Sequence, residues 1–503
     1  MKISCEILRK QLESRFDLVC FVDFADVCST HSAIFSLLKT VHQQEYLPNQ
    51  RLIFYSSQKP SQGLVNHLQL AASRMDVSNF FILICSPDNI NKELDIAKKL
   101  HAYDNVAMSW MQTELVDTKP LLDSGFVPRT SFCPLLFGSL LVDTPGTVSP
   151  CCKFQGVVGN LNNNSLNEIF HNEAMTALRT QIKNEVQPKE CRVCWDLEKK
   201  GVTSFRQHAI HKYQDQNDHE WIDDLKIRDV SISPSTLCNF KCRICHPATS
   251  SQIAVEELKH TTDPDKISHL KSLLKLSNWN SNYFEKPLEE LNYDFEHLHF
   301  LGGEPFILPE LVSILEKIIK SGNSKKMQLE FHTNGSHFSN AIIKLFNQFK
   351  KVEVLLSIDN IGPRFEIERG GTWSTIKENI SQFAEINSEF ISVKLAITVN
   401  LQNLLYLDEM VDFADQKNVS IVWWYLEYPS YLCIDNVTQS VKDLVYTKYH
   451  DHHTPELQKI SNRVQLAKPI SGQAFINYMN QLDQRRGQHF SQTHSEIFNA
   501  MGN

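Results

Sequence analysis

The chain has 503 residues, a length that suggests about three domains of roughly 150 residues each. Apolar residues make up 42% of the sequence and charged residues 21%, as expected for a globular protein that can bury a sizeable core. The formal net charge is −8 and no long run carries one sign, so the composition does not favour nucleic-acid binding.

Nothing in the sequence indicates a membrane or secretory protein. No apolar run approaches the roughly 18 residues that cross a bilayer, and the first residues lack the pattern of a signal peptide. The 13 cysteines are an odd number, and eight of them fall in two compact regions, whereas a disulfide scaffold would be shorter and denser in cysteine. We therefore expect a cytoplasmic protein whose cysteines bind metal.

Residues 1–120 are predicted to form an N-terminal doubly wound α/β domain. Apolar runs of strand length alternate there with amphipathic helical patterns, which predicts a parallel sheet covered on both faces. The strands are expected at 18–24, 52–55, 80–85 and 106–110, and the helices at 31–41, 64–75 and 91–100. Neither a G-x-G-x-x-G motif nor a Walker loop is present, so the patterns assign no role to this domain.

Residues 121–212 hold the first cysteine group. A β-hairpin is predicted at 140–148 around Pro145-Gly146, followed by a helix whose start has capping-box form, Ser165 three residues before Glu168. The five thiols of this group belong to Cys133, Cys151, Cys152, Cys191 and Cys194. Four thiolates suit either a structural zinc ion or a closed [4Fe–4S] cluster, and their spacing does not decide between them.

Residues 213–435 repeat a strand–helix unit six times. The strands are expected at 227–233, 297–301, 327–333, 352–358, 393–399 and 419–426, with a mostly helical insertion at 249–293. Six such units make an open, incomplete version of the eight-unit barrel, a (β/α)6 core in which chemistry is expected at the carboxyl ends of the strands. Residues 436–503 are predicted to be a helical extension.

The second cysteine group lies at the end of the first of these strands. Cys238, Cys242 and Cys245 are spaced C-x3-C-x2-C, and three thiolates can hold three irons of a [4Fe–4S] cube while the fourth iron stays open to a small molecule. The alternative is a zinc site in which His246 supplies a fourth ligand.

These motifs together resemble the radical S-adenosylmethionine (SAM) superfamily. Cys238, Cys242 and Cys245 match its cysteine triad, and Gly302-Gly303-Glu304-Pro305 matches its G-G-E-P motif at the end of the second strand. The resemblance implies a TIM-like radical SAM barrel, a SAM-binding [4Fe–4S] cluster and S-adenosylmethionine as a cofactor. The residues that it places at SAM are Gly302, Gly303, Glu304, Pro305, Asn334, Ser357 and Asp359.

The first cysteine group resembles a SPASM or twitch domain, which binds an auxiliary [4Fe–4S] cluster. The module precedes the barrel here, and this order together with Arg369-Gly370-Gly371-Thr372-Trp373 is similar to the twitch-domain subgroup. The resemblance implies that Cys133, Cys191 and Cys194 bind the auxiliary cluster together with Cys151 or Cys152. A cluster closed by four thiolates is expected to transfer electrons.

The activity that the resemblance implies is reductive cleavage of SAM to a 5′-deoxyadenosyl radical, which abstracts hydrogen from a peptide or small-molecule substrate. A one-electron donor such as flavodoxin or ferredoxin is the expected partner. The competing hypothesis is a non-enzymatic α/β scaffold with a zinc ribbon. No residue stands out as a general base or radical donor. Strand parity nominates polar side chains that face the barrel interior: Glu330, His332, Asn334, Lys394, Thr398, Asn400, Trp423, Tyr425 and Glu427.

Overall fold

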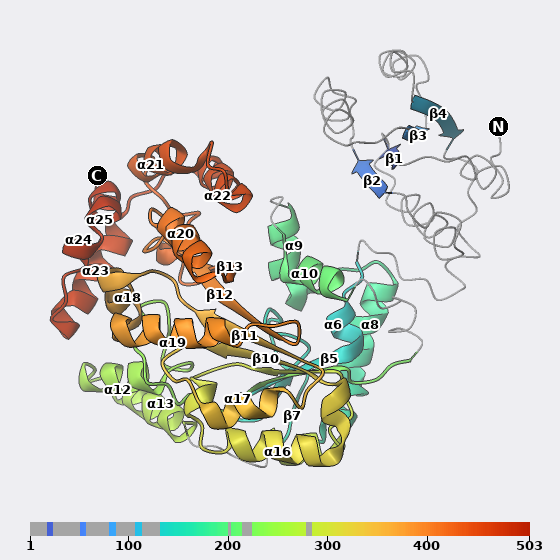
Figure 1. Cartoon of the computed structure of the whole chain (residues 1–503), viewed down its shortest axis with the longest axis horizontal. Coiled ribbons are helices and arrows are strands. Elements are labelled where there is room, and N and C mark those ends of the chain that lie inside the picture. The colour runs from blue at the N-terminus through green and yellow to red at the C-terminus, as the bar shows by residue number, and fades with distance from the viewer. Residues whose placement is uncertain are drawn as a thin grey trace. The chain divides into compact units, whose positions relative to one another are not determined.

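The computed structural model describes residues 131–199, 203–213, 224–277 and 284–502, and the backbone of four strands before residue 113. Figure 1 shows the elements coloured along the chain. The chain divides into two compact units. The first unit is Met1–Cys133, Leu178–Lys189 and Ile210–Asp223, and the second is Pro134–Ala177, Glu190–Ala209 and Asp224–Asn503. The finer division at residues 120, 212 and 435 stays a prediction.

The first unit contains a parallel four-stranded sheet with the order β2-β1-β3-β4. Its strands are β1 (Leu18–Asp23), β2 (Arg51–Ser56), β3 (Phe80–Ser86) and β4 (Val106–Gln112). The four strands confirm the prediction from the apolar runs, because β-branched and aromatic residues fit a buried parallel sheet. The three predicted helices of this region lie outside the described residues.

The second unit is built on a nine-stranded sheet with the order β13-β12-β11-β10-β9-β8-β5-β6-β7. The six predicted barrel strands are all present, and each pairs in parallel with its neighbour. They are β8 (Asp229–Ser233), β9 (His297–Phe300), β10 (Gln328–Thr333), β11 (Lys351–Ser357), β12 (Ile391–Val399) and β13 (Ser420–Tyr425). Successive parallel strands with helical crossovers form the partial TIM-like barrel that the pattern predicts.

The predicted hairpin extends this same sheet, which the sequence did not indicate. Strand β5 (Ser139–Asp143) pairs in parallel with β8, and β6 (Thr147–Ser149) and β7 (Gly159–Asn160) follow in antiparallel pairing. The first four residues of β5 are buried, because the strand is sandwiched within the sheet and does not form a free hairpin arm. Cys151 and Cys152 therefore come directly after β6, on a continuation of the barrel sheet.

The predicted single helix after Ser165 is two helices. Ser165 and Glu168 form the predicted capping box at the start of α7 (Leu166–Phe170). The side chain of Asn172 accepts a hydrogen bond from the backbone N–H of Met175 at 2.9 Å and donates to the carbonyl of Val158 at 2.8 Å, so the chain restarts as α8 (Glu173–Lys183). The other helices of this region are α6 (Pro134–Gly138), α9 (Arg192–Lys199) and α10 (Phe205–Lys212).

Helices follow the barrel strands, and aromatic rings join the two layers. The ring of Phe331 on β10 stacks on Phe300 of β9 at 4.8 Å and contacts Phe346 of α17 at 5.6 Å. The crossover helices are α16 (Leu311–Ser321), α17 (Asn340–Phe346), α18 (Gly362–Arg369), α19 (Trp373–Glu385) and α20 (Leu407–Lys417). The insertion is helical as predicted, with α12 (Ser251–Lys259), α13 (Pro264–Lys275) and α15 (Lys286–Glu290).

The predicted C-terminal helical extension is confirmed, and its last helices lie beside α18 (Figure 1). It consists of α21 (Gln439–Tyr449), α22 (Pro455–Leu466), α23 (Gln473–Arg486), α24 (Phe490–Thr493) and α25 (Ser495–Gly502). Among the described residues, no helix has both the length and the apolar character that a membrane crossing needs.

Candidate functional site

The three cysteines of the triad lie in one compact loop after β8. Cys238 and Cys242 are buried and Cys245 is half-buried. The backbone N–H of Cys245 donates to the carbonyl of Cys242 at 3.1 Å, so the second and third thiols share one turn. A hydrogen bond between these thiols lowers the pKa of Cys242 to about 7 and raises the pKa of Cys245, while burial raises the pKa of Cys238 to about 11.

The start of α12 holds the loop in place from one side. The hydroxyl of Ser250 donates to the carbonyl of Phe240 at 2.8 Å, and the hydroxyl of Ser251 accepts from the backbone N–H of Cys238 at 3.2 Å. Both serines are buried. His246, the alternative zinc ligand, is exposed just after the third cysteine.

The G-G-E-P turn lies directly against the cysteine loop. Gly302 and Gly303 have positive φ values of 65° and 50°, a conformation that favours glycine. A Cβ on Gly303 would lie 2.7 Å from the carbonyl oxygen of Ser235 and still closer to that of Leu237. The backbone N–H of Glu304 donates to the Leu237 carbonyl at 2.8 Å. The glycine therefore permits a close approach of two backbones, as the motif suggested.

The carboxylate of Glu304 is buried and accepts three hydrogen bonds. Oε1 accepts from the hydroxyl of Thr333 at 2.6 Å and from the backbone N–H of Phe306 at 3.0 Å, and Oε2 accepts from the backbone N–H of Asn334 at 2.6 Å. Burial raises the pKa of Glu304, and the three hydrogen bonds oppose this rise. The carboxylate thus ties the second strand end to the third.

We expect Glu304→Gln to destabilise the protein by about 1–3 kcal/mol, because the amide NH2 must face one of two buried backbone N–H groups and leave it without an acceptor. Urea unfolding measures this change in the free energy of unfolding. Thr333→Ser is the matched control, since it keeps the hydroxyl that donates to Glu304 and accepts from the backbone N–H of Gly335. Equal losses in the two variants would contradict the role given to the carboxylate.

Asn334 joins the end of β10 to the cysteine loop. Its side-chain amide donates to Oδ1 of Asn239 at 2.9 Å and lies 3.9 Å from the sulfur of Cys238. Ser357 is the half-buried last residue of β11, and Pro305 begins a short 3-10 turn after the glycines. The structure therefore brings Asn334 and the G-G-E-P turn together at the triad.

Asp359 and Arg369 form a buried ion pair next to the triad. Arg369 Nη1 pairs with Asp359 Oδ2, and the backbone N–H of Thr398 donates to Asp359 Oδ1 at 2.8 Å. Burial raises the pKa of Asp359, and Arg369 opposes that rise. Burial lowers the pKa of Arg369, but Cys242, Asp359 and Cys245 outweigh it and raise that pKa above its ordinary value.

Sequence reasoning did not assign Arg369 to the site, although its motif was noted. The carbonyl of Arg369 accepts from the thiol of Cys242 at 3.7 Å, and a Cβ on Gly371 would lie 2.7 Å from Cε1 of Phe240. The glycines after Arg369 therefore allow this turn to lie flat on the cysteine loop. The triplet Arg-Gly-Gly after a strand and a short helix was the available signal.

These features fit an iron–sulfur cluster with a bound organic ligand. Three thiols lie in one loop beside the buried cation of Arg369, which can offset negative charge. The Nε of Arg369 is buried and has no hydrogen-bond partner among the described residues, so it can bind an anionic or polar group. In the described part of the chain, no three His, Cys, Asp or Glu side chains form a group that could hold a metal ion as they are placed.

The first cysteine group is spread over both units. Cys133 belongs to the first unit, and the other four cysteines belong to the second. Within the second unit, the backbone N–H of Gln155 donates to the carbonyl of Glu190 at 2.8 Å, which brings the segment after Cys151 and Cys152 next to Cys191. Cys194 is buried, Cys151 and Cys191 are half-buried, and Cys152 is exposed.

A small buried network supports Cys194. Arg206 Nη2 donates to Glu198 Oε2 at 2.6 Å, and its guanidinium lies 4.3 Å from the centre of the Trp195 ring. The hydroxyl of Ser204 also donates to Glu198. Burial raises the pKa of Cys194, while a hydrogen bond to the backbone of Arg206 lowers it. Glu198, Ser204 and Arg206, which follow Cys194 in the sequence, thus contact one another.

Two family models match the chain. A model described as the radical SAM superfamily matches residues 232–414, and a model described as an iron–sulfur cluster-binding domain, SPASM, matches residues 133–195. No curated protein matches. The two matched domains imply a SAM-binding [4Fe–4S] cluster and an auxiliary iron–sulfur cluster.

Several solved structures are similar at low identity. SuiB from Streptococcus suis, solved with the precursor peptide SuiA, is 14% identical over 48% of this chain and 54% of its own, with a TM-score of 0.27. TsrM from Kitasatospora setae, a radical SAM methyltransferase with cobalamin and a [4Fe–4S] cluster bound, is 10% identical over 82% of this chain and 75% of its own, with a TM-score of 0.29. The chain thus spans about half the length of SuiB.

The assignment depends on the family models and on the way the structure assembles the triad, the G-G-E-P turn and the Arg369 turn. The matches lie on the elements that carry these motifs: the SPASM match contains the first cysteine group, and the radical SAM match contains the triad and strands β9 to β12. The chain therefore carries a radical SAM domain at residues 232–414, preceded by a SPASM- or twitch-like iron–sulfur domain at residues 133–195.

Proposed function

We propose that the protein cleaves SAM reductively and abstracts a hydrogen atom from a peptide or small-metabolite substrate. The observation that carries the proposal is the cysteine loop held between two glycine turns, one before Glu304 and one after Arg369. Cys238, Cys242 and Cys245 would hold the [4Fe–4S] cluster. When bound, the cluster supplies the electron that splits the SAM sulfonium and releases the 5′-deoxyadenosyl radical.

The protein's own residues place the cofactor. The turn at Gly302 and Gly303 lies directly against the loop, and the buried oxygens of Glu304 and the amide of Asn334 supply polar groups at its edge. Asp359, held by Arg369, and Ser357 stand at the end of the next strand. We propose these residues, with Pro305, as the SAM contacts, because polar groups at strand ends are what binds ligands in such barrels.

For the auxiliary cluster we propose thiolates from the cysteines of the SPASM match. Cys191 and Cys194 lie on one helical turn, and the contact between Gln155 and Glu190 supports the inclusion of Cys151, with Cys152 as its alternative. Cys133 completes the set that the sequence pattern suggests. An auxiliary cluster with four thiolates would carry an electron away from the substrate radical, and a small flavodoxin or ferredoxin would supply the first electron.

Polar groups on the inner face of the barrel support a polar substrate. His299 links Asp229 and Glu330, with Nε2 3.1 Å from one carboxylate and Nδ1 3.2 Å from the other. His332 Nε2 lies 3.1 Å from Glu330 Oε1, and Lys394 pairs with Glu353 on the neighbouring strands. Side chains on one face of successive strands line the barrel interior, so a substrate with amide, amine or carboxylate groups would find partners there.

We expect the anaerobically purified protein to be brown and to hold roughly eight irons per chain, as two four-iron clusters require. Reduction with dithionite in the presence of SAM should then yield methionine and 5′-deoxyadenosine, measured by mass spectrometry. Metal analysis on the same sample separates the alternatives: a colourless protein loaded with zinc that forms no 5′-deoxyadenosine would support the binding scaffold and contradict the proposal.

The substrate class can be tested through the hydrogen that is abstracted. Extract from cells grown in deuterated medium, separated into a peptide and a small-metabolite fraction, supplies labelled candidates. Deuterium in the 5′-deoxyadenosine should appear with one fraction and be absent with the same fraction from unlabelled cells. If SAM is cleaved but neither fraction transfers deuterium to 5′-deoxyadenosine, the substrate is neither a peptide nor a small metabolite from these cells.

A further inference from the structure

A buried arginine lies inside the cysteine triad and points at the C-terminal extension. Arg243 follows the second cysteine and is 1% exposed. Its Nε donates to the carbonyl of Ile367 at 3.1 Å, and its Nη2 donates to Oε1 of Gln488 at 2.9 Å and pairs with Asp483. The guanidinium also lies 5.2 Å from the centre of the Phe490 ring. Its charged partner therefore comes from α23, about 240 residues further along the chain.

The backbone of the same loop is bound by α23 as well. The hydroxyl of Tyr478 donates to the carbonyl of Arg243 at 2.6 Å. Arg486 Nη1 donates to the carbonyl of Lys241 at 2.8 Å, and its Nη2 pairs with Glu256 at 2.7 Å. Helix α23 thus contacts the residues on both sides of Cys242 through side chain and backbone.

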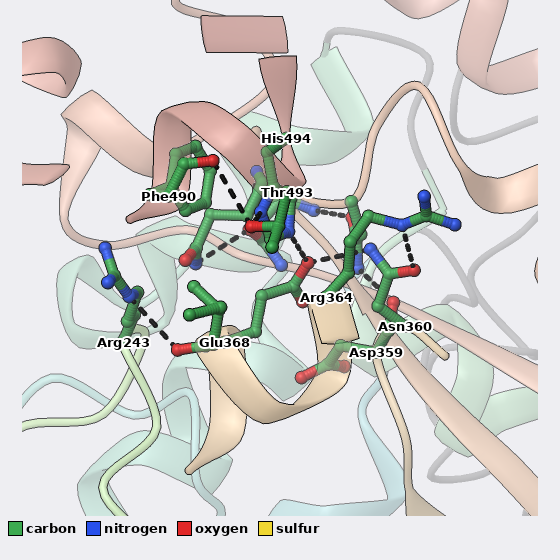
Figure 2. Close-up of polar contacts among 12 residues, drawn as sticks. Arg243, Asp359, Asn360, Arg364, Glu368, Phe490, Thr493 and His494 are labelled. Atoms are coloured by element: carbon green, nitrogen blue, oxygen red, sulfur yellow. Dashed lines mark hydrogen bonds and ion pairs between the residues drawn. The ribbon is translucent and has the colours of Figure 1, made fainter. Parts of the chain in front are cut away.

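A second set of contacts joins the loop to the end of β11 (Figure 2). The backbone N–H of Arg243 donates to the carbonyl of Glu368 at 2.7 Å. The carboxylate of Glu368 accepts from the amide of Asn360 at 2.8 Å and lies 2.9 Å from Nε2 of His494. His494 is fully buried and stacks on Phe490 with ring centres 4.0 Å apart. Asn360 directly follows Asp359, a proposed SAM contact.

Burial of these charges has a physical consequence. A buried ion pair adds little net stability compared with apolar packing. The loss of one partner is strongly destabilising, however, because it leaves the other charge buried and unpaired. Arg243 and Glu368 are both buried, and each has a partner in the segment 478–494. An apolar helix would cover the loop equally well, so the polar contacts define where the loop lies relative to the Asp359–Asn360 turn.

We propose that residues 478–494 belong to the cofactor site and help to determine the affinity for SAM. Asp483 and His494 are positioning residues, which hold the cysteine loop against the Asp359–Asn360 turn. This inference rests on the proposed function. Asp483 acts through Arg243, and His494 acts through Glu368 and Asn360.

The test compares Asp483→Asn and His494→Phe with Thr438→Val in the full-length, reconstituted protein. The readouts are iron and sulfide content, thermal unfolding, and the change in the EPR spectrum of the reduced protein during a SAM titration. We expect both variants to keep their iron and to need about tenfold more SAM for half of the spectral change. His494→Gln retains a donor to Glu368 and should need a SAM concentration close to that of the unaltered protein.

Thr438→Val is the matched control because Thr438 is buried in the same extension and its hydroxyl donates to the carbonyl of Ala500 at 2.6 Å. It should unfold at a lower temperature with its SAM half-saturation unchanged. The proposal is overturned if Asp483→Asn and His494→Phe also lose only thermal stability. His494→Phe decides the matter if Asp483→Asn does not fold. A lack of any SAM-dependent spectral change in the unaltered protein would instead refute the proposed function.

Discussion

Simultaneous replacement of Cys238, Cys242 and Cys245 by alanine is expected to abolish SAM cleavage and to remove about four irons per chain, half of the content that two four-iron clusters give. The reason is local: the three thiols share one loop, and no other described cysteine lies on it. Production of 5′-deoxyadenosine by the dithionite-reduced variant, measured with iron content and visible absorbance, checks the expectation.

Cys433→Ala provides the control for this triple variant. Cys433 is also a buried free thiol, but it does not belong to the triad loop, and it donates to the carbonyl of Pro429 at 3.3 Å. The control should keep its iron and its rate of SAM cleavage. If the triple variant still forms 5′-deoxyadenosine at the rate of the control, the assignment of the cluster to this loop is wrong.

The sequence predicted the strands and helices whose residues follow a local periodic pattern. The four N-terminal strands are mostly apolar runs, which are typical of a parallel sheet buried on both faces, whereas barrel strands β8, β9 and β10 alternate apolar and polar residues, which also predicts strands. The triad and the G-G-E-P turn were found because their spacing is short and their glycines have a backbone role. In the structure Gly303 does lie against the carbonyls of Ser235 and Leu237.

The contacts that complete the site could not be read from local patterns. Tyr478 and Gln488 reach Arg243 from 235 and 245 residues away, and no periodicity relates positions so distant. Strand β5 appeared to be one arm of a free hairpin because its pairing partner β8 begins almost ninety residues later. Arg369 was visible only as part of a motif, since its ion pair with Asp359 depends on how α18 returns the chain to the strand end.

Gly303→Ala is expected to destabilise the protein by about 2–5 kcal/mol, the sum of a left-handed backbone for a residue with a Cβ, about 1–2 kcal/mol, and overpacking of about 1–3 kcal/mol. The new Cβ would meet the carbonyl oxygens of Ser235 and Leu237. These are backbone atoms, so the cysteine loop itself must move. We therefore expect SAM cleavage to fall at least about a hundredfold, as the loss of a few kcal/mol at a binding site implies.

Gly322→Ala separates the two contributions, because Gly322 has a positive φ of 84° and no atom lies within 4 Å of the position that its new Cβ would take. The control carries the backbone strain alone and should lose about 1–2 kcal/mol with its SAM cleavage intact. Urea unfolding and 5′-deoxyadenosine formation are measured on both variants. Both substitutions place a residue with a Cβ at a positive φ, but only Gly303→Ala also brings the new Cβ against the backbone of the cysteine loop. Equal stability losses and equal cleavage rates would therefore mean that the close approach at Gly303 does not hold the cysteine loop in place.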